Sequence, residues 1–120
     1  MKYEWLDGYL LEKPGAHKDY KPEWDAARYM IRGKMFVMFG GDKYGKPIYT
    51  FKLEPGFGQF LRQQYKDIVP GYYMNKDHWS SLYVGGDVTD SVVKEMADMA
   101  YNVLLATLPQ KTQKEIASEE

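Results

Sequence analysis

The stretch Val69–Trp79, VPGYYMNKDHW, is where a turn, aromatic rings and several kinds of polar side chain meet in this sequence. Pro70-Gly71 predicts a turn that leads into a short extended piece at Tyr72–Met74. A further strand is predicted at Trp79–Val84, followed by a turn at Gly85-Gly86-Asp87. Short connections of this kind are typical of an antiparallel sheet.

The side chains of this stretch are candidate ligand-binding groups. We expect a recess between the turn and the sheet, lined by Tyr72, Asn75, Lys76, His78 and Trp79. Aromatic rings beside an ammonium and an amide suit a flat or anionic ligand. In a purely structural interpretation, the rings belong to the core, Asn75 holds a turn and His78 is a satisfied polar group. The residues alone leave both interpretations open.

Toward the N-terminus, the pattern predicts one helix and three strands. Tyr3–Glu12 has apolar residues at helical spacing, and Pro14-Gly15 ends the helix. Ala16–Asp25 is expected to be a polar connection, in which Trp24 folds back over the core or over the mouth of a cleft. Strands are predicted at Ala26–Ile31, Lys34–Phe39 and Ile48–Leu53, with the first two joined by a hairpin at Arg32-Gly33. The second strand is apolar on both faces, which predicts a central position.

Two more helices are predicted. Pro55 begins the first one, whose buried stripe is expected to be Phe57, Phe60, Leu61 and Tyr65. Thr89 is the expected N-cap of the last helix, and Pro109 ends it. The core stripe of this last helix is predicted to be Val93, Met96, Ala100, Val103 and Leu104.

The predicted order is α-β-β-β-α-β-β-α, which indicates an α+β two-layer sandwich with an antiparallel sheet and helices packed on one face. Residues 1–109 then form a single domain. Gln110–Glu120 is polar, and we expect a disordered C-terminal tail there.

Composition limits the class of protein. A chain of 120 residues with 44% hydrophobic and 16% aromatic residues is about one folded domain. It contains no cysteine, which excludes disulfides and thiolate metal sites and fits a reducing, cytoplasmic location. The N-terminal segment has no long apolar run, and no stretch approaches the roughly 20 apolar residues of a membrane span.

Charge is unevenly distributed along the chain. The net charge is −1, but residues 43–76 carry six basic and two acidic side chains, whereas residues 77–120 carry three basic and eight acidic ones. A basic middle segment can form a patch that holds an anion. Lysines that merely solvate strand edges and a helix face produce the same pattern.

Several catalytic sites are disfavoured by the residues. Gly40–Lys46 resembles part of a phosphate-binding loop, but Pro47 stands where a hydroxyl is needed and a strand follows, so we predict a hairpin loop. His17 and His78 do not form a metal-binding pair on a helix. Asp77, His78 and the following serines alternate faces along a strand and cannot converge as a triad. We therefore predict no catalytic residue, metal or cofactor.

At the level of motifs, the chain resembles the MmcQ/YjbR family over about Trp5 to Leu108. The resemblance is most specific in PGYxxNKxHW, which Pro70-Gly71-Tyr72, Asn75-Lys76 and His78-Trp79 match. Other matching segments are Lys13-Pro14-Gly15-Ala16, Trp24-Asp25, Gly33-Lys34-Met35-Phe36, Leu53-Glu54-Pro55 after Lys52, Arg62, Asp90 and Tyr101. The resemblance implies a frataxin-like (CyaY-like) or secretion-chaperone-like α+β fold.

The family is often described as DNA-binding through a "double-wing" arrangement of strands, so the resemblance implies a nucleic-acid-binding module. The expected binding residues are Lys34, Lys52, Arg62, Tyr72, Asn75, Lys76, His78, Trp79 and Trp24. The acidic last helix and the lack of a recognition helix dense in Arg and Lys depart from that role.

Other functions remain open. The chain is alternatively an adaptor, monomeric or homodimeric, that binds a protein partner, a peptide or a small anion in the same cleft. A third hypothesis is an enzyme that uses His78 as acid or base, with Lys76 and Asn75 as oxyanion donors. No membrane association is expected.

Overall fold

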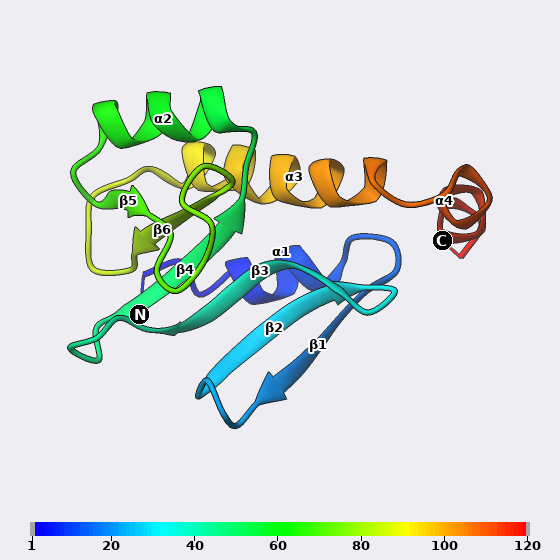
Figure 1. Ribbon diagram of the computed structural model, residues 1–120, viewed down its shortest axis with the longest axis horizontal. Coiled ribbons are helices and arrows are strands. Elements are labelled where there is room, and N and C mark those ends of the chain that lie inside the picture. The colour runs from blue at the N-terminus through cyan, green and yellow to red at the C-terminus, as the bar shows by residue number, and fades with distance from the viewer. Residues whose placement is uncertain (1, 120) are drawn as a thin grey trace.

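Six strands form one antiparallel sheet in the order β1-β2-β3-β4-β6-β5 in the computed structural model, which describes residues 2–119 (Figure 1). The strands are β1 (Ala16–Lys21), β2 (Ala26–Ile31), β3 (Lys34–Gly41), β4 (Pro47–Lys52), β5 (Ile68–Pro70) and β6 (Trp79–Tyr83). The helices are α1 (Leu6–Leu11), α2 (Pro55–Gln64), α3 (Asp90–Ala106) and α4 (Gln110–Ala117). The α+β two-layer sandwich predicted from the sequence is confirmed.

One face of the sheet is buried beneath helices. Tyr29 pairs with Val37 and Val37 with Phe51, so these three side chains lie on the same face of neighbouring strands. All three are buried, and α3 packs against β3 and β4 with Met96 and Ala100 facing the sheet layer. The hydrophobic core of the molecule therefore lies between this face and the helices.

The predicted hairpin between β2 and β3 is confirmed, with φ values of 50° at Arg32 and 79° at Gly33. A bulge interrupts the simple alternation expected in β3. The register shifts between Tyr29 and Met30, so both Phe36 and Val37 are buried on the helical side. The Phe36 ring meets the Tyr101 ring edge to face at 5.7 Å.

The expectation that Ala16–Asp25 is only a connection is wrong, because β1 occupies Ala16–Lys21. This edge strand carries mainly polar residues, and such a strand lacks the apolar alternation that marks a strand in a sequence. The extended piece expected at Tyr72–Met74 is also misplaced. The strand β5 comes earlier, at Ile68–Pro70, where Ile68 is buried against β6.

The expected disordered tail is wrong for residues 110–117, which form α4. The side chain of Ile116 is 1% exposed and packs on Gly15, where an added Cβ would lie 3.1 Å from it. Arg32 and Glu119 form an ion pair at 3.0 Å. Four of the eight residues of α4 are Lys, Glu or Thr, so its single buried contact is not evident from composition. Glu120 lies outside the described residues.

The buried stripe of α2 differs from the predicted one. Phe60 is 55% exposed, whereas Gly58 and Leu61 are buried. Gly58 lets α2 approach β6 closely, since an added Cβ would lie 3.1 Å from the Ser80 hydroxyl. Phe57 and Tyr65 pack against the core as predicted, so Phe60 alone departs from the expected stripe. In α3, Val93, Met96, Ala100 and Leu104 are buried as predicted, and Val103 is half-buried.

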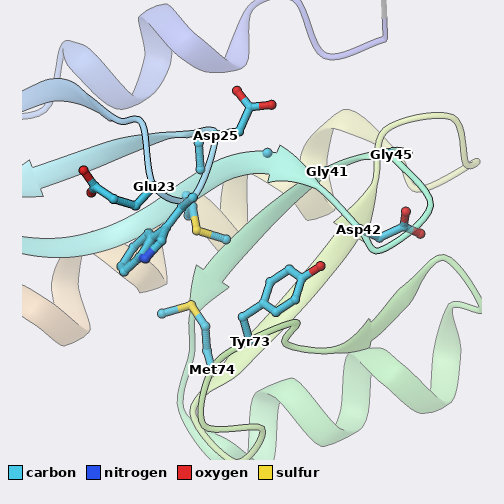
Figure 2. A pocket seen from close by; sticks show the side chains of 11 residues that line it. Glu23, Asp25, Gly41, Asp42, Gly45, Tyr73 and Met74 are labelled. Atoms are coloured by element: carbon cyan, nitrogen blue, oxygen red, sulfur yellow. The ribbon is translucent and has the colours of Figure 1, made fainter.

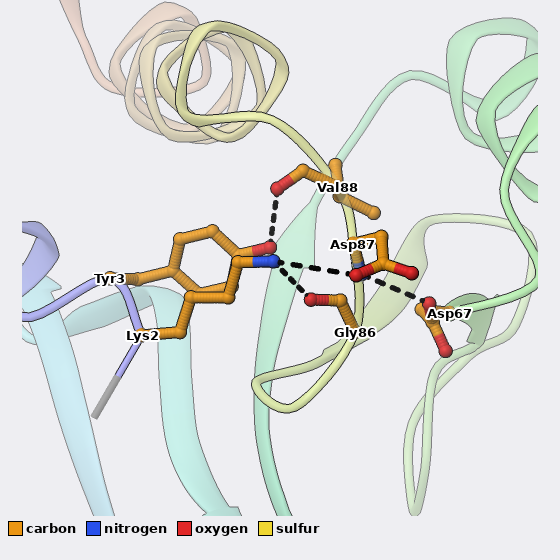
Figure 3. Close-up of polar contacts among 6 residues, drawn as sticks. All are labelled: Lys2, Tyr3, Asp67, Gly86, Asp87 and Val88. Carbon is orange, nitrogen blue, oxygen red and sulfur yellow. Dashed lines mark hydrogen bonds and ion pairs between the residues drawn. The ribbon is translucent and has the colours of Figure 1, made fainter.

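The residues before α1 are fastened to the turn between β6 and α3 (Figure 3). The Tyr3 hydroxyl donates a hydrogen bond to the Val88 carbonyl at 2.5 Å. The Lys2 ammonium donates to the Gly86 carbonyl and lies 3.9 Å from the Asp87 carboxylate. These contacts tie the start of the chain to a segment more than 80 residues away in sequence.

Candidate ligand-binding pocket

The second face of the sheet is partly covered by residues 71–78, which form a loop between β5 and β6. Figure 1 shows this 71–78 loop crossing in front of β4. Met38, Thr50 and Ser81 are neighbours in the register on this face. Thr50 and Ser81 are buried and share a hydrogen bond of 2.7 Å, and the Tyr72 amide donates to the Ser81 hydroxyl at 3.3 Å. The loop is therefore seated on a satisfied polar pair.

The 71–78 loop is held in shape by residues that the sequence marks as ligand-binding. The Asn75 side-chain oxygen accepts a hydrogen bond from the Asp77 amide at 2.9 Å, which is the turn-holding role. The Lys76 ammonium donates to the Gly71 carbonyl at 2.9 Å. The Arg62 guanidinium of α2 donates to the Lys76 carbonyl, also at 2.9 Å. These groups support the loop, and their direct role toward a ligand stays a prediction.

Gly71 is required by the close approach of the two ends of this loop. Its amide donates to the Trp79 carbonyl at 2.8 Å. A Cβ at position 71 would lie 2.7 Å from the Trp79 Cβ and 2.9 Å from its carbonyl oxygen. Only glycine fits there without displacing the backbone of β6.

The other predicted site residues form a group around Trp79, apart from Lys34 and Trp24, and Lys52 is the partner of Trp79 in the register. The Tyr72 hydroxyl is 3.1 Å from that of Tyr83. Trp79 is buried, with the Lys52 ammonium 5.6 Å from its ring centroid, and His78 is exposed. Lys34 begins β3 at the β2–β3 hairpin, at the opposite end of that strand from Gly40. The structure therefore does not gather the predicted basic residues into one patch with Trp24.

Trp24 instead belongs to a pocket on the second face of the sheet, with a volume of about 580 Å³ (Figure 2). Trp24 is 50% exposed, and Tyr73 of the 71–78 loop is 72% exposed. Met38 and Met74 add flexible apolar surface. The remaining lining residues are Glu23, Asp25, Ala26, Gly40, Gly41, Asp42 and Gly45. Of the two positions expected for Trp24, over the core or over the mouth of a cleft, its exposure and its place in the pocket lining fit the second.

The charged residues that line this pocket are all acidic: Glu23, Asp25 and Asp42. Glu23 is paired with Lys21 at 3.4 Å, and Asp25 accepts a hydrogen bond from the Tyr20 hydroxyl. Within residues 2–119, neither Asp25 nor Asp42 takes part in an ion pair. The pocket lining thus offers negative charge to a ligand.

Asp42 also shapes the loop between β3 and β4. One carboxylate oxygen accepts the amides of Tyr44 at 2.8 Å and Lys46 at 2.9 Å, and the other accepts the Tyr83 hydroxyl at 2.9 Å. Burial alone would raise the pKa of Asp42, but these hydrogen bonds lower it below its ordinary value. Asp42 therefore stays ionised. Its bonds to the amides of Tyr44 and Lys46 close residues 42–46 into the predicted hairpin loop, which is not a phosphate-binding loop.

Cations of the chain itself surround the Trp24 ring. The Lys21 ammonium is 5.1 Å and the Arg28 guanidinium 5.7 Å from its centroid. Arg28 is committed to a two-pronged pair with Asp19, with bonds of 2.8 and 2.6 Å. Lys43 lies 5.2 Å from the ring centroid of Tyr44 in the neighbouring hairpin loop. None of these basic side chains lines the pocket itself.

A second cavity, of about 470 Å³, lies between α2 and α3. Phe57 and Met99 supply apolar surface there, and Asp98 lies at its wall. The Asp98 carboxylate is already bonded to the Lys13 ammonium at 2.6 Å and the Tyr9 hydroxyl at 2.7 Å. Among residues 2–119, no three His, Asp or Glu side chains are grouped to hold a metal ion, and no helix is long and apolar enough to cross a membrane.

The sequence pointed to one wall of the pocket and missed the rest. Trp24 was predicted, but Tyr73 and Met74 were passed over although they lie within the PGYYMNKDHW stretch. Their neighbours Asn75 and Lys76 carry more obvious chemistry but face the loop backbone. The acidic residues beside Trp24 were a usable signal, since Glu23 and Asp25 flank it directly.

Comparisons with known proteins agree on one family. The YjbR family model matches residues 11–103. The YjbR protein of Escherichia coli K12 is 30% identical over 106 residues, covering 88% of this chain and 89% of that protein. The YbdF protein of Escherichia coli O157:H7 is 31% identical over 97 residues, covering 81% of this chain and 77% of that protein.

Solved structures show the same fold. The Deinococcus radiodurans protein DR2400, a DUF419 domain, has a TM-score of 0.84 at 20% identity, covering 97% of this chain and 88% of that one. A Pseudomonas syringae protein has a TM-score of 0.73 at 18% identity, covering 86% of this chain and 98% of that one.

Proposed function

This chain belongs to the YjbR family, and we propose that it is a binding module which receives a side chain of a protein partner between Trp24 and Tyr73. One observation carries the proposal. A half-exposed tryptophan and an exposed tyrosine line the same concave pocket. Tryptophan and tyrosine are the residues most enriched at the energetic centres of protein interfaces.

The dimensions and support of the pocket agree with this role. Its volume falls within the roughly 300–1,000 Å³ of typical ligand pockets. Tyr73 and Met74 lie in the 71–78 loop, which Lys76 and Arg62 stabilise through hydrogen bonds to its carbonyl groups. A braced loop loses little conformational entropy when a ligand binds, which favours affinity.

A peptide array with sequences of varied charge and aromatic content tests the proposal. The labelled protein is expected to bind a subset of peptides, and Trp24→Ala and Tyr73→Ala are expected to lose that subset. Phe60→Ala is the matched control, because Phe60 is an equally exposed aromatic residue on α2 outside the pocket. Binding that survives Trp24→Ala, or no binding to any peptide, contradicts the proposal.

Nucleic-acid binding is the second candidate function. Its support is two lysines that lie near exposed aromatic rings, Lys21 by Trp24 and Lys43 by Tyr44. Bases stack on exposed rings while lysines hold phosphates. The acidic pocket lining opposes phosphate entry, and Arg62 and Lys76 are already bonded to carbonyl groups. Protein partners are therefore favoured.

Fluorescence titration with single- and double-stranded oligonucleotides tests this second candidate. If it holds, binding weakens by orders of magnitude between about 50 and 200 mM salt, and Lys52→Ala, Lys34→Ala and Lys43→Ala each weaken it. A response that ignores salt, or none at low salt, removes nucleic acid as a ligand.

A further inference from the structure

We propose that the pocket between Trp24 and Tyr73 selects a cationic side chain, an arginine or lysine of the partner. The inference rests on the binding role proposed above and adds the chemical class of the ligand. It follows from three features of the pocket: the charge of its lining, the exposure of the Trp24 side chain, and the position of Lys21.

The lining carries negative charge that the chain does not neutralise by ion pairing. Asp25 and Asp42 form no ion pair within residues 2–119, although each accepts hydrogen bonds. Asp42 stays ionised because the amides of Lys46 and Tyr44 and the Tyr83 hydroxyl lower its pKa against the effect of burial. The carboxylates lie around the edge of the pocket (Figure 2), and their charge attracts a cation and repels a phosphate or carboxylate.

The walls are suited to the same ligand. A tryptophan ring is the best aromatic partner for an ammonium or guanidinium group, which sits over the ring face within about 6 Å of its centroid. Tyr73, which is also exposed, lines the same pocket (Figure 2). Between them, Met38 and Met74 can contact the aliphatic stem of a long basic side chain.

Lys21 already makes the two contacts that we assign to the ligand. Its ammonium lies 5.1 Å from the Trp24 ring centroid and 3.4 Å from the Glu23 carboxylate. Lys21 does not itself line the pocket, but it neutralises Glu23 and places positive charge beside the Trp24 ring. It therefore lowers the attraction of the pocket for an external cation.

The Lys21→Ala substitution gives a test, because it is expected to change the affinity for a basic partner and for a nucleic acid in opposite directions. For a basic partner, Lys21→Ala frees Trp24 and Glu23 and strengthens binding by about two- to fivefold. For a nucleic acid, the same substitution removes a phosphate contact and weakens binding.

The experiment measures fluorescence anisotropy of labelled oligo-arginine, oligo-lysine, oligo-glutamate and neutral aromatic peptides of equal length, and of oligothymidine. We expect the wild-type protein to bind the basic peptides. Trp24→Ala is expected to weaken this binding at least tenfold, and Glu23→Gln and Asp25→Asn are each expected to weaken it severalfold. Asparagine tolerates the φ of 48° at position 25, so Asp25→Asn removes charge without backbone strain. Glu95→Gln on α3 is the control for general attraction to the acidic half of the chain, and it is expected to change nothing.

Each contrary result has a distinct meaning. Neutral aromatic peptides that bind through Trp24 but ignore Glu23→Gln and Asp25→Asn overturn the charge selectivity and leave the proposed binding role intact. Oligothymidine binding that Lys21→Ala weakens overturns it in favour of nucleic acid. Basic peptides that bind equally to Trp24→Ala, with no other peptide requiring Trp24, overturn both proposals.

Discussion

The Lys76 ammonium and the Gly71 carbonyl are joined by a hydrogen bond of 2.9 Å that spans the 71–78 loop from one side to the other. Lys76 thus holds together the loop that presents Tyr73 and Met74 to the pocket. In the PGYYMNKDHW stretch, Asn75 and Lys76 hold the loop in shape through hydrogen bonds to its backbone, whereas Tyr73 and Met74 line the pocket.

Replacing Lys76 should loosen this loop without unfolding the protein. Lys76→Met removes the hydrogen bond to Gly71, and we expect faster amide hydrogen exchange across residues 71–78 and a loss of about 1 kcal/mol in the free energy of unfolding. Hydrogen-exchange mass spectrometry and urea unfolding measure the two effects. Lys66→Met, at an exposed position just beyond α2, is the control. Unchanged exchange in the loop would show that the bond does not hold it.

Gly71 should tolerate no side chain. In Gly71→Ala the new Cβ would meet the Trp79 backbone at 2.9–3.0 Å, so we expect a loss of roughly 1–3 kcal/mol in the free energy of unfolding. Gly8→Ala is the opposite case, since Gly8 lies within α1 with nothing within 4 Å of an added Cβ. That substitution should be neutral or stabilising by up to about 1 kcal/mol. Equal melting temperatures for the two variants would contradict this account.

Asp98 should contribute to stability at neutral pH and lose that contribution in acid. Burial would raise its pKa, but hydrogen bonds from Lys13 and Tyr9 lower it below its ordinary value near 3.8. A carboxyl group whose pKa is lowered by folding stabilises the protein above its unfolded pKa, and this stabilisation disappears as pH falls through the folded pKa. Asp98→Asn should therefore be less stable by about 1 kcal/mol at pH 7, with a flatter stability profile below pH 4.

Chemical unfolding from pH 2 to pH 7 measures this difference. Asp87→Asn serves as the control, because the Asp87 side chain is almost fully exposed and lies 3.9 Å from Lys2. If Asp98→Asn and the wild-type protein lose stability in parallel as pH falls, the pair with Lys13 contributes nothing.

Tyr9 should resist ionisation in alkali. Its hydrogen bond to Asp98, together with burial, raises its pKa to about 12. The stabilisation from a raised pKa is complete below the unfolded value of 10.0 and is lost as pH rises from there through 12. The phenolate absorbance of wild type minus Tyr9→Phe should therefore titrate near pH 12. Titration near pH 10 would show that Tyr9 and Asp98 are not bonded in solution.

Ile116 should anchor α4 to the sheet. Ile116→Ala removes a fully buried side chain packed on Gly15, and we expect a loss of roughly 2–4 kcal/mol in the free energy of unfolding. Glu115→Ala, at the exposed neighbouring position, should change it by less than about 0.5 kcal/mol. Thermal unfolding compares the two variants. Similar melting temperatures would indicate that α4 is detached in solution.

The contrast between the β2–β3 hairpin and β1 shows what the sequence predicts and what it does not. Local signals place the hairpin, because Gly33 has the positive φ that its turn demands. No local signal places β1 or α4, since both are mainly polar. β1 is ordered by pairing with the adjacent β2, whereas α4 is held by the contact of Ile116 with Gly15, which is distant in sequence. In α2 the sequence pattern wrongly includes Phe60, which is exposed, and omits Gly58, which packs near Ser80 and carries no hydrophobic signal.

The pocket was likewise predictable from the sequence only in part. Trp24 was predictable from its size, because a ring of that area rarely lies in water without a role. Its partners were not predictable, since Tyr73 and Trp24 line the same pocket only when the 71–78 loop folds back over the sheet. Side-chain chemistry drew attention to Asn75 and Lys76, whereas the backbone hydrogen bonds that occupy them depend on the folded loop.

The fastening of the first residues to the β6–α3 turn, and of Tyr9 and Lys13 to Asp98, bears on the order in which the chain folds during synthesis. The first helix leaves the ribosome long before its partners, because each of these contacts joins positions 85 or more residues apart. In the nascent protein, α1 and the apolar face of the sheet cannot complete their packing until α3 has been synthesised. Such non-local contacts slow folding and prolong the exposure of apolar surface, so the unfinished chain is prone to aggregation during synthesis.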